Sequence, residues 1–106
     1  MPSALIADDE RLMREQLRAR LREVWPELEI AAEAKNGQEA VLLTEQLHPD
    51  VVFLDIRMPV LTGVDAARQI AQLATYDEAS GWPGCEIVFI TAYDQESWQH
   101  TIIVEI

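Results

Sequence analysis

The segment Val51–Pro59 limits the possible folds of this 106-residue chain more than any other stretch. It closely follows Pro49, begins with four consecutive apolar residues and ends at a second proline, which predicts a short strand buried on both faces. Such strands are typical of parallel sheets, which bind ligands at the carboxyl ends of their strands. Asp55 lies at that end. It is therefore either a functional acid or only the start of a turn.

The rest of the chain alternates between strand and helix patterns. Strands are expected over residues 4–7, 28–34 and 86–92, and helices over residues 11–23, 38–47 and 64–73. The polar positions of segment 28–34 predict an edge strand, and the glycine, proline and serine residues within 75–84 predict an exposed loop. The alternation predicts an α/β fold, a doubly wound parallel sheet with right-handed crossovers and helices on both faces.

The spacing of apolar residues assigns a buried face to each helix. In the first helix, spacings of mostly three and four residues select Leu12, Met13, Leu17, Leu21 and Val24. Its other face carries Arg14, Arg18 and Arg22 between glutamates, and it is expected to be a solvated surface. The second helix is expected to bury a stripe that includes Leu42 and Leu47.

The composition excludes some classes of partner. The net charge of −11 argues against direct binding to nucleic acid or an anionic membrane, because both require basic residues, whereas it permits divalent metal binding. Cys85 is the only cysteine, so the chain has no intramolecular disulfide, which fits a reducing cytoplasm. The N-terminus lacks the pattern of a signal peptide, and no apolar stretch is long enough to span a bilayer.

The expected strand ends place acids and a hydroxyl at one edge of the sheet. Asp8 and Asp9 follow the first strand, Asp55 ends the third, and Thr91 lies at the end of the fourth. Neighbouring carboxylates repel one another unless a cation lies between them, and oxygen ligands suit Mg²⁺ or Mn²⁺. Such a metal could bridge to a phosphoryl group on an aspartate, with the Thr91 hydroxyl nearby. The alternatives are a helix cap for the Asp8-Asp9 pair and an ordinary strand residue for Thr91.

Three motifs together resemble the receiver domain of bacterial two-component response regulators. They are Leu5–Glu10, Val51–Pro59 with Gly63, and Ile87–Tyr93. The resemblance covers about residues 4–95 and implies a flavodoxin-like fold. The form of segment 91–94 is similar to receivers that carry a LytTR-type DNA-binding domain.

The resemblance also implies roles for individual residues. Asp55 would accept a phosphoryl group from a histidine kinase or a small acyl phosphate. Asp9, Asp55 and the backbone carbonyl of Arg57 would bind Mg²⁺, and Asp8 would help through water. Thr91 would move toward the phosphoryl group and report its presence.

The chain departs from the family pattern at its C-terminal end. The family has a lysine after a fifth strand, but the only lysine is Lys35, at the end of the second strand. We therefore expect a partial receiver over 1–95, incomplete at the fifth strand and last helix, with an atypical tail over 96–106. Residues 101–106 have the composition of a strand, which would pair antiparallel or join another molecule's sheet. Apolar surface left by the missing helix predicts a homo-oligomer, possibly formed by exchanged elements.

Three functions compete on this basis. The first is a phosphoacceptor module, not an enzyme, in a cytoplasmic phosphorelay that regulates transcription. The second is a non-catalytic Mg²⁺-binding interaction or dimerisation domain, which the missing lysine favours. The third is an aspartate-phosphate hydrolase, which is disfavoured because Arg57 stands where such enzymes carry a second acid.

Overall fold

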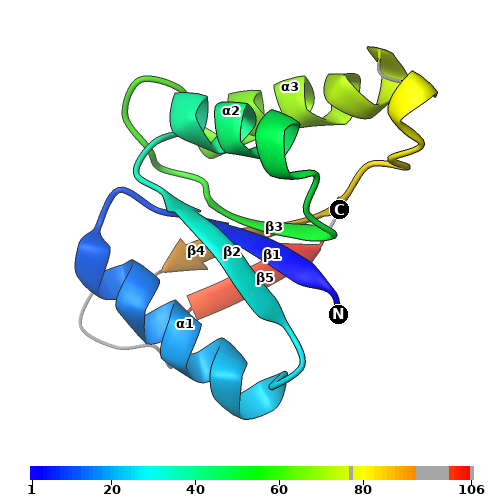
Figure 1. The fold of residues 1–106 in the computed structure, drawn as a ribbon. Helices are drawn as coiled ribbons and strands as arrows, with labels where there is room; N and C mark the ends of the chain where they lie inside the picture. Colours follow the sequence, from blue (N-terminus) through cyan, green and yellow to red (C-terminus); the bar gives the residue numbers. More distant parts are fainter. Residues whose placement is uncertain (77, 93–100, 106) are drawn as a thin grey trace.

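The described residues form five strands, three α-helices and one short 3-10 helix (Figure 1). The computed structural model describes residues 1–76, 78–92 and 101–105. In chain order the elements are β1 (Ser3–Ala7), α1 (Arg11–Val24), β2 (Glu29–Ala34), α2 (Gly37–Leu47), β3 (Val51–Asp55), α3 (Gly63–Tyr76), the 3-10 helix η1 (Glu78–Ser80), β4 (Glu86–Ala92) and β5 (Thr101–Glu105). The predicted alternation of strands and helices is therefore confirmed.

All five strands belong to one sheet with the order β2-β1-β3-β4-β5. The pairs β1–β2, β1–β3 and β3–β4 are parallel, which confirms the parallel sheet and the edge position of β2. β5 pairs antiparallel with β4, with Ile103 opposite Ile90, so the tail takes the first of its two expected pairings. The rest of the expected tail, and the Tyr93-Asp94 part of the LytTR-like motif, lie outside the described residues.

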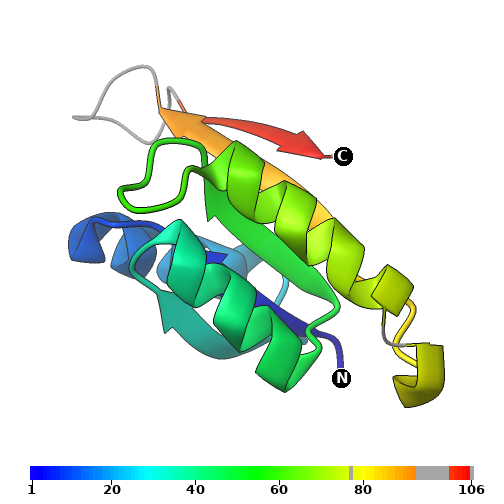
Figure 2. The same ribbon diagram turned by 90° about the horizontal axis from the view of Figure 1, so that it is seen from above.

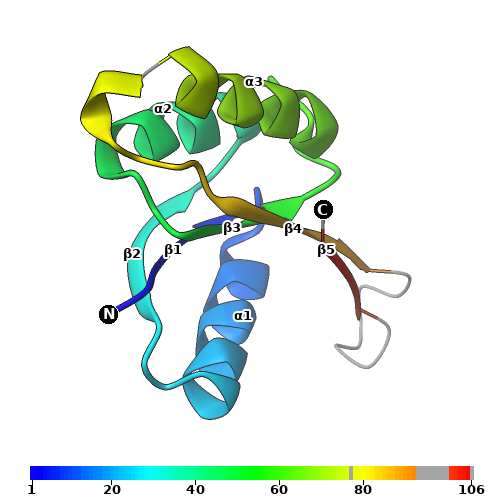
Figure 3. The same cartoon turned by 90° about the vertical axis from the view of Figure 1, so that its right-hand side faces the viewer.

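The sheet forms the middle of three layers. Figures 1 and 2 show α2 and α3 side by side over one face of the sheet, and Figure 3 shows α1 on the opposite face. β5 forms the edge of the sheet opposite β2. Of the described helices, none is long and apolar enough to cross a membrane.

Alternate residues of each strand enter two separate apolar clusters. In β3, Val52 and Leu54 pack in the cluster beneath α2 and α3, while Val51 and Phe53 pack in the cluster beneath α1. All four side chains are buried, so the prediction of a strand buried on both faces is confirmed. Each such side chain contributes about 1.5–3 kcal/mol to folding, so this run anchors both halves of the core.

The predicted buried face of α1 is partly wrong. Leu12 and Val24 are 62% and 68% exposed, whereas Arg14, expected in solvent, is only 8% exposed. Leu17 and Leu21 are buried as expected. The residues that face the sheet therefore include position 14, three residues before Leu17, and the arginine is tolerated there because its charge is paired.

Two smaller expectations also need correction. In α2, Leu42 and Leu47 are half exposed, while Thr44 is fully buried, and its hydroxyl is satisfied there because it donates to the Ala40 carbonyl oxygen at 2.7 Å. The expected loop over 75–84 is partly helical, since α3 continues to Tyr76 and η1 follows.

Candidate acidic site at the carboxyl edge of the sheet

The ends of the two central strands bring three carboxylates together. The register pairs Ala7 of β1 with Leu54 of β3, so Asp8 and Asp55 are the next residues on neighbouring strands. Asp8, Asp9 and Asp55 each offer an oxygen atom, and these atoms all lie within 4.8 Å of one another. The convergence expected from the strand ends is therefore present. In the strand order, β2 lies on one side of β1, and β3 and β4 lie on the other. The acids meet at the carboxyl ends of β1 and β3, where the order reverses, and this is the usual position of ligand sites in open parallel sheets.

Hydrogen bonds from backbone amides hold the two acidic loops in place. The Glu10 amide donates to Asp8 Oδ1 at 2.9 Å, and the Arg57 amide donates to Asp55 Oδ1 at 3.3 Å. The residue that caps α1 is Glu10, and its side chain makes no capping hydrogen bond. Neither Asp8 nor Asp9 is therefore the N-cap of this helix, so the helix-cap alternative does not explain the pair.

Burial and mutual repulsion both disfavour ionisation at this site. The pKa of Asp8 is raised from 3.8 to about 7, first by burial and then by the charges of Asp55 and Asp9, against the hydrogen bond from the Glu10 amide, which lowers it. Burial also raises the pKa of Asp55, as do the charges of Asp9 and Glu10. A divalent cation between these oxygen atoms would remove the repulsion. The all-oxygen donor set matches Mg²⁺ rather than a softer metal.

The loop after β3 fixes the position of Asp55. The Gly63 amide donates to the Ile56 carbonyl oxygen at 3.0 Å, and a Cβ atom at Gly63 would overlap the Asp55 carbonyl group. Met58 is buried beneath the loop, whereas Val60 is exposed at a φ of 70°, a conformation that β-branched residues rarely adopt. The start of α3 therefore packs directly against the backbone of the acid.

The other predicted site residues lie around this centre. Arg57 is exposed and follows Asp55 closely, so its backbone reaches the same edge. Thr91 lies near the end of β4, opposite Ile102, but its side chain is outside the described part of the chain. Lys35 follows β2, and β1 separates that strand from β3. It is therefore two strands away from Asp55.

Sequence reasoning missed Arg14. Its Nη1 atom donates to the Asp8 carbonyl oxygen at 2.7 Å, directly behind the acidic cluster. The available signal was its position on the same helical stripe as Leu17 and Leu21. A charged residue on an apolar stripe indicates a buried partner, and that partner, Glu33, comes from β2.

Comparison with known proteins places these features in context. The family model described as the response regulator receiver domain matches residues 4–105. An uncharacterized response regulatory protein of Vibrio cholerae is 48% identical over 93 residues, which cover 88% of this chain and 33% of that protein. A similar protein of Yersinia pestis is 42% identical over 95 residues, with 90% and 36% covered. The chain thus spans about a third of the length of these relatives.

Solved structures show the same architecture. The receiver domain of AraT from Geobacillus stearothermophilus has a TM-score of 0.71 and 32% identity, covering 92% of this chain and 69% of that one. The receiver domain of Ssk1 from Saccharomyces cerevisiae, solved with the histidine phosphotransfer protein Ypd1, has a TM-score of 0.72 and 29% identity, with 90% and 66% covered. The predicted flavodoxin-like receiver fold is therefore confirmed.

Proposed function

Since the chain belongs to the response regulator receiver domain family, we propose that it accepts a phosphoryl group on Asp55 in a two-component phosphorelay. The observation that carries this proposal is the convergence of the Asp8, Asp9 and Asp55 oxygen atoms within 4.8 Å at the carboxyl edge of the sheet. In this role the domain is a signalling module rather than an enzyme that turns over a substrate. We place it in the cytoplasm, as part of a protein that regulates transcription.

The proposed chemistry needs one nucleophile and charge neutralisation. A carboxylate oxygen of Asp55 attacks the phosphorus of a phosphohistidine, the P–N bond breaks, and the imidazole leaves with the bonding electrons and takes up a proton. Mg²⁺, when bound, would neutralise the phosphoryl oxygens. Asp8, Asp9, Asp55 and the Arg57 carbonyl would hold it. Thr91 would donate its hydroxyl to a phosphoryl oxygen and report the modification.

The partner is proposed to be a histidine kinase or a histidine phosphotransfer protein. The support is the family itself and the similarity to Ssk1, whose receiver domain was solved with a histidine phosphotransfer protein. We further propose that the domain forms a homo-oligomer. We also propose that it does not itself bind nucleic acid, since its net charge is −11. A LytTR-type output domain stays a prediction.

A second candidate is a Mg²⁺-binding interaction domain that no longer transfers phosphate. It is favoured by one observation, the position of the only lysine, Lys35, two strands away from Asp55. At that distance Lys35 cannot stabilise a phosphoryl group on Asp55.

Treatment with acetyl phosphate and Mg²⁺, followed by intact-protein mass spectrometry, tests both candidates. Phosphoacceptor function predicts the mass gain of one phosphoryl group, which disappears in Asp55→Asn and persists in the control Asp65→Asn, an exposed acid at the start of α3. Mg²⁺ binding without a mass gain would instead support the interaction domain. A mass gain that survives in Asp55→Asn would rule out Asp55 as the acceptor.

A further inference from the structure

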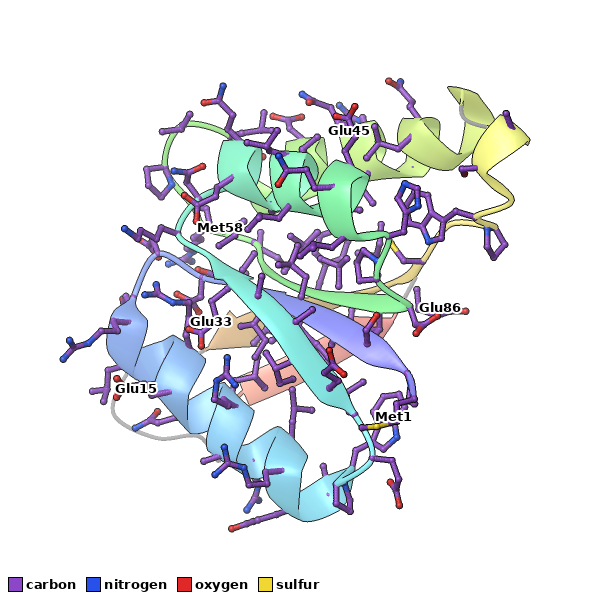
Figure 4. All side chains as sticks on the ribbon, in the orientation of Figure 1. Met1, Glu15, Glu33, Glu45, Met58 and Glu86 are labelled. Carbon is purple, nitrogen blue, oxygen red and sulfur yellow. The ribbon has the colours of Figure 1, made fainter. Side chains whose placement is uncertain are left out.

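A partly buried network of charges joins α1 to β2 behind the acidic site. Glu33 of β2 accepts from Arg14 Nε at 3.0 Å, and its second oxygen accepts from Arg18 Nε at 2.9 Å and Arg18 Nη2 at 2.7 Å. In Figure 4, Glu33 lies between β2 and α1. Burial raises the pKa of Glu33, but the hydrogen bonds from Arg18 and Arg14 outweigh it and the pKa is lowered. The network is therefore charged and fully engaged at neutral pH.

Arg14 extends this network to the acidic loop. Its guanidinium donates through Nε to Glu33 and through Nη1 to the Asp8 carbonyl oxygen at 2.7 Å. Arg18 also pairs with Glu33, but its side-chain hydrogen bonds in the described part of the chain go to Glu33 and not to the acidic loop. The rigid fork of Arg14 thus links a side chain of β2 to the main chain of the loop after β1, which a lysine ammonium cannot do with the same geometry.

The Asp8 carbonyl belongs to the peptide group that joins Asp8 to Asp9. That group is planar, so a donor that holds its oxygen also limits the directions in which the two side chains leave the chain. The loop has few other anchors, because Glu10 caps α1 without a side-chain hydrogen bond. Among the described residues, the loop's other hydrogen bonds are the Asp8 amide to Ala34 O at 3.1 Å, the Glu10 amide to Asp8 Oδ1 at 2.9 Å and the Arg14 amide to Glu10 O at 3.1 Å.

We propose that Arg14, held by Glu33, is a positioning residue that sets the spacing of the Asp8 and Asp9 carboxylates opposite Asp55 for cation binding. This inference rests on the proposed Mg²⁺ site. In this role Arg14 strengthens cation binding, although its positive charge alone would weaken it. A nearby positive charge weakens cation binding by simple electrostatics, so its removal should tighten binding, whereas loss of a positioning contact should weaken it.

Mg²⁺ titration calorimetry on the full chain separates these two effects. Arg14→Met should weaken Mg²⁺ binding by about 10-fold, the lower range for loss of a residue that orients metal ligands. The matched control Arg18→Met removes the same charge and also breaks bonds to Glu33, but leaves the Asp8 carbonyl contact, and it should change the affinity by less than about two-fold. Arg14→Lys keeps the charge and replaces Arg14→Met if the latter does not fold.

Hydrogen exchange of the Glu10 amide, measured without metal, gives an independent readout. Its bond to Asp8 Oδ1 should open more often in the Arg14 variant, giving exchange about 10-fold faster than in the Arg18 control. Arg14→Met that binds Mg²⁺ as tightly as wild type, or more tightly, would overturn the inference. If the wild type binds no Mg²⁺, the cation site itself is refuted, and equal Glu10 exchange in both variants would then refute the positioning role as well.

Discussion

Replacement of Asp8 by asparagine tests the electrostatic cost of the acidic cluster. In Asp8→Asn the side chain keeps its size and an oxygen that can accept from the Glu10 amide, but it loses the charge that lies beside Asp9 and Asp55. We expect the metal-free variant to be more stable than the wild type at pH 8. The reason is that Asp8 in the wild type must ionise in a half-buried position near two other acids.

The size of the effect follows from the raised pKa. The pKa of Asp8 rises from 3.8 to about 7 on folding, which sets an upper limit of about 4 kcal/mol on the penalty for ionisation. Because the group is partly exposed, solvent screening reduces this figure to about 1–2 kcal/mol. The folded state binds more protons than the unfolded state between these pKa values, so the stability of the wild type falls as the pH rises from about 4 to about 8. The difference between variant and wild type should therefore be near zero at pH 4 and largest at pH 8.

Urea denaturation followed by far-UV circular dichroism, with chelator present, measures this difference. Adding Mg²⁺ at pH 8 should stabilise the wild type, by about 2.7 kcal/mol at 100 times the dissociation constant, and stabilise Asp8→Asn less. Glu45→Gln, a change at an exposed acid on α2, is the control for loss of one negative charge. A variant that is less stable than the wild type at pH 8 without metal, or a difference that does not depend on pH, would refute the reasoning.

Three further predictions concern the surroundings of the site. Gly63→Ala should lower the free energy of unfolding by about 1–3 kcal/mol and weaken Mg²⁺ binding, because the new Cβ atom would displace the Asp55 carbonyl; urea denaturation and calorimetry measure both. Val60→Asn should raise the free energy of unfolding by about 1 kcal/mol in the same denaturation assay, since asparagine tolerates the positive φ better than valine. Burial, with the charges of Glu86 and Asp50, raises the pKa of the Cys85 thiol to about 11, so alkylation at pH 7.5 should be about 100-fold slower than in the urea-unfolded chain and should accelerate as the pH rises. Equal alkylation rates in the folded and unfolded chain would contradict the last prediction.

Much of the fold follows from local patterns in the sequence. The run Val51–Asp55 predicts a strand buried on both faces because it leaves no polar side for solvent, and the structure confirms this. The partly polar segment of β2 predicts an edge, and β2 lies at one. The connection after β4 is too short for a helical crossover, which made an antiparallel β5 one of the two expected pairings.

The candidate site was predictable for the same reason. Parallel strands end at the same edge of a sheet, so acids that follow β1 and β3 must meet once the strand order is known. Their positions in the sequence were enough to bring Asp8, Asp9 and Asp55 together, without any knowledge of side-chain packing.

The sequence by itself determined the strands, their parallel sheet and the edge at which the three acids meet, because these depend on hydrophobic runs and on the alternation of strands and helices. Only the tertiary structure decided which face of α1 is buried and what Arg14 does. A helical pattern that contains Leu12 and Val24 as well as Leu17 and Leu21 permits more than one rotation of the helix. The choice depends on the pairing of Arg14 with Glu33 and with the Asp8 carbonyl, two groups that the local pattern of α1 does not contain.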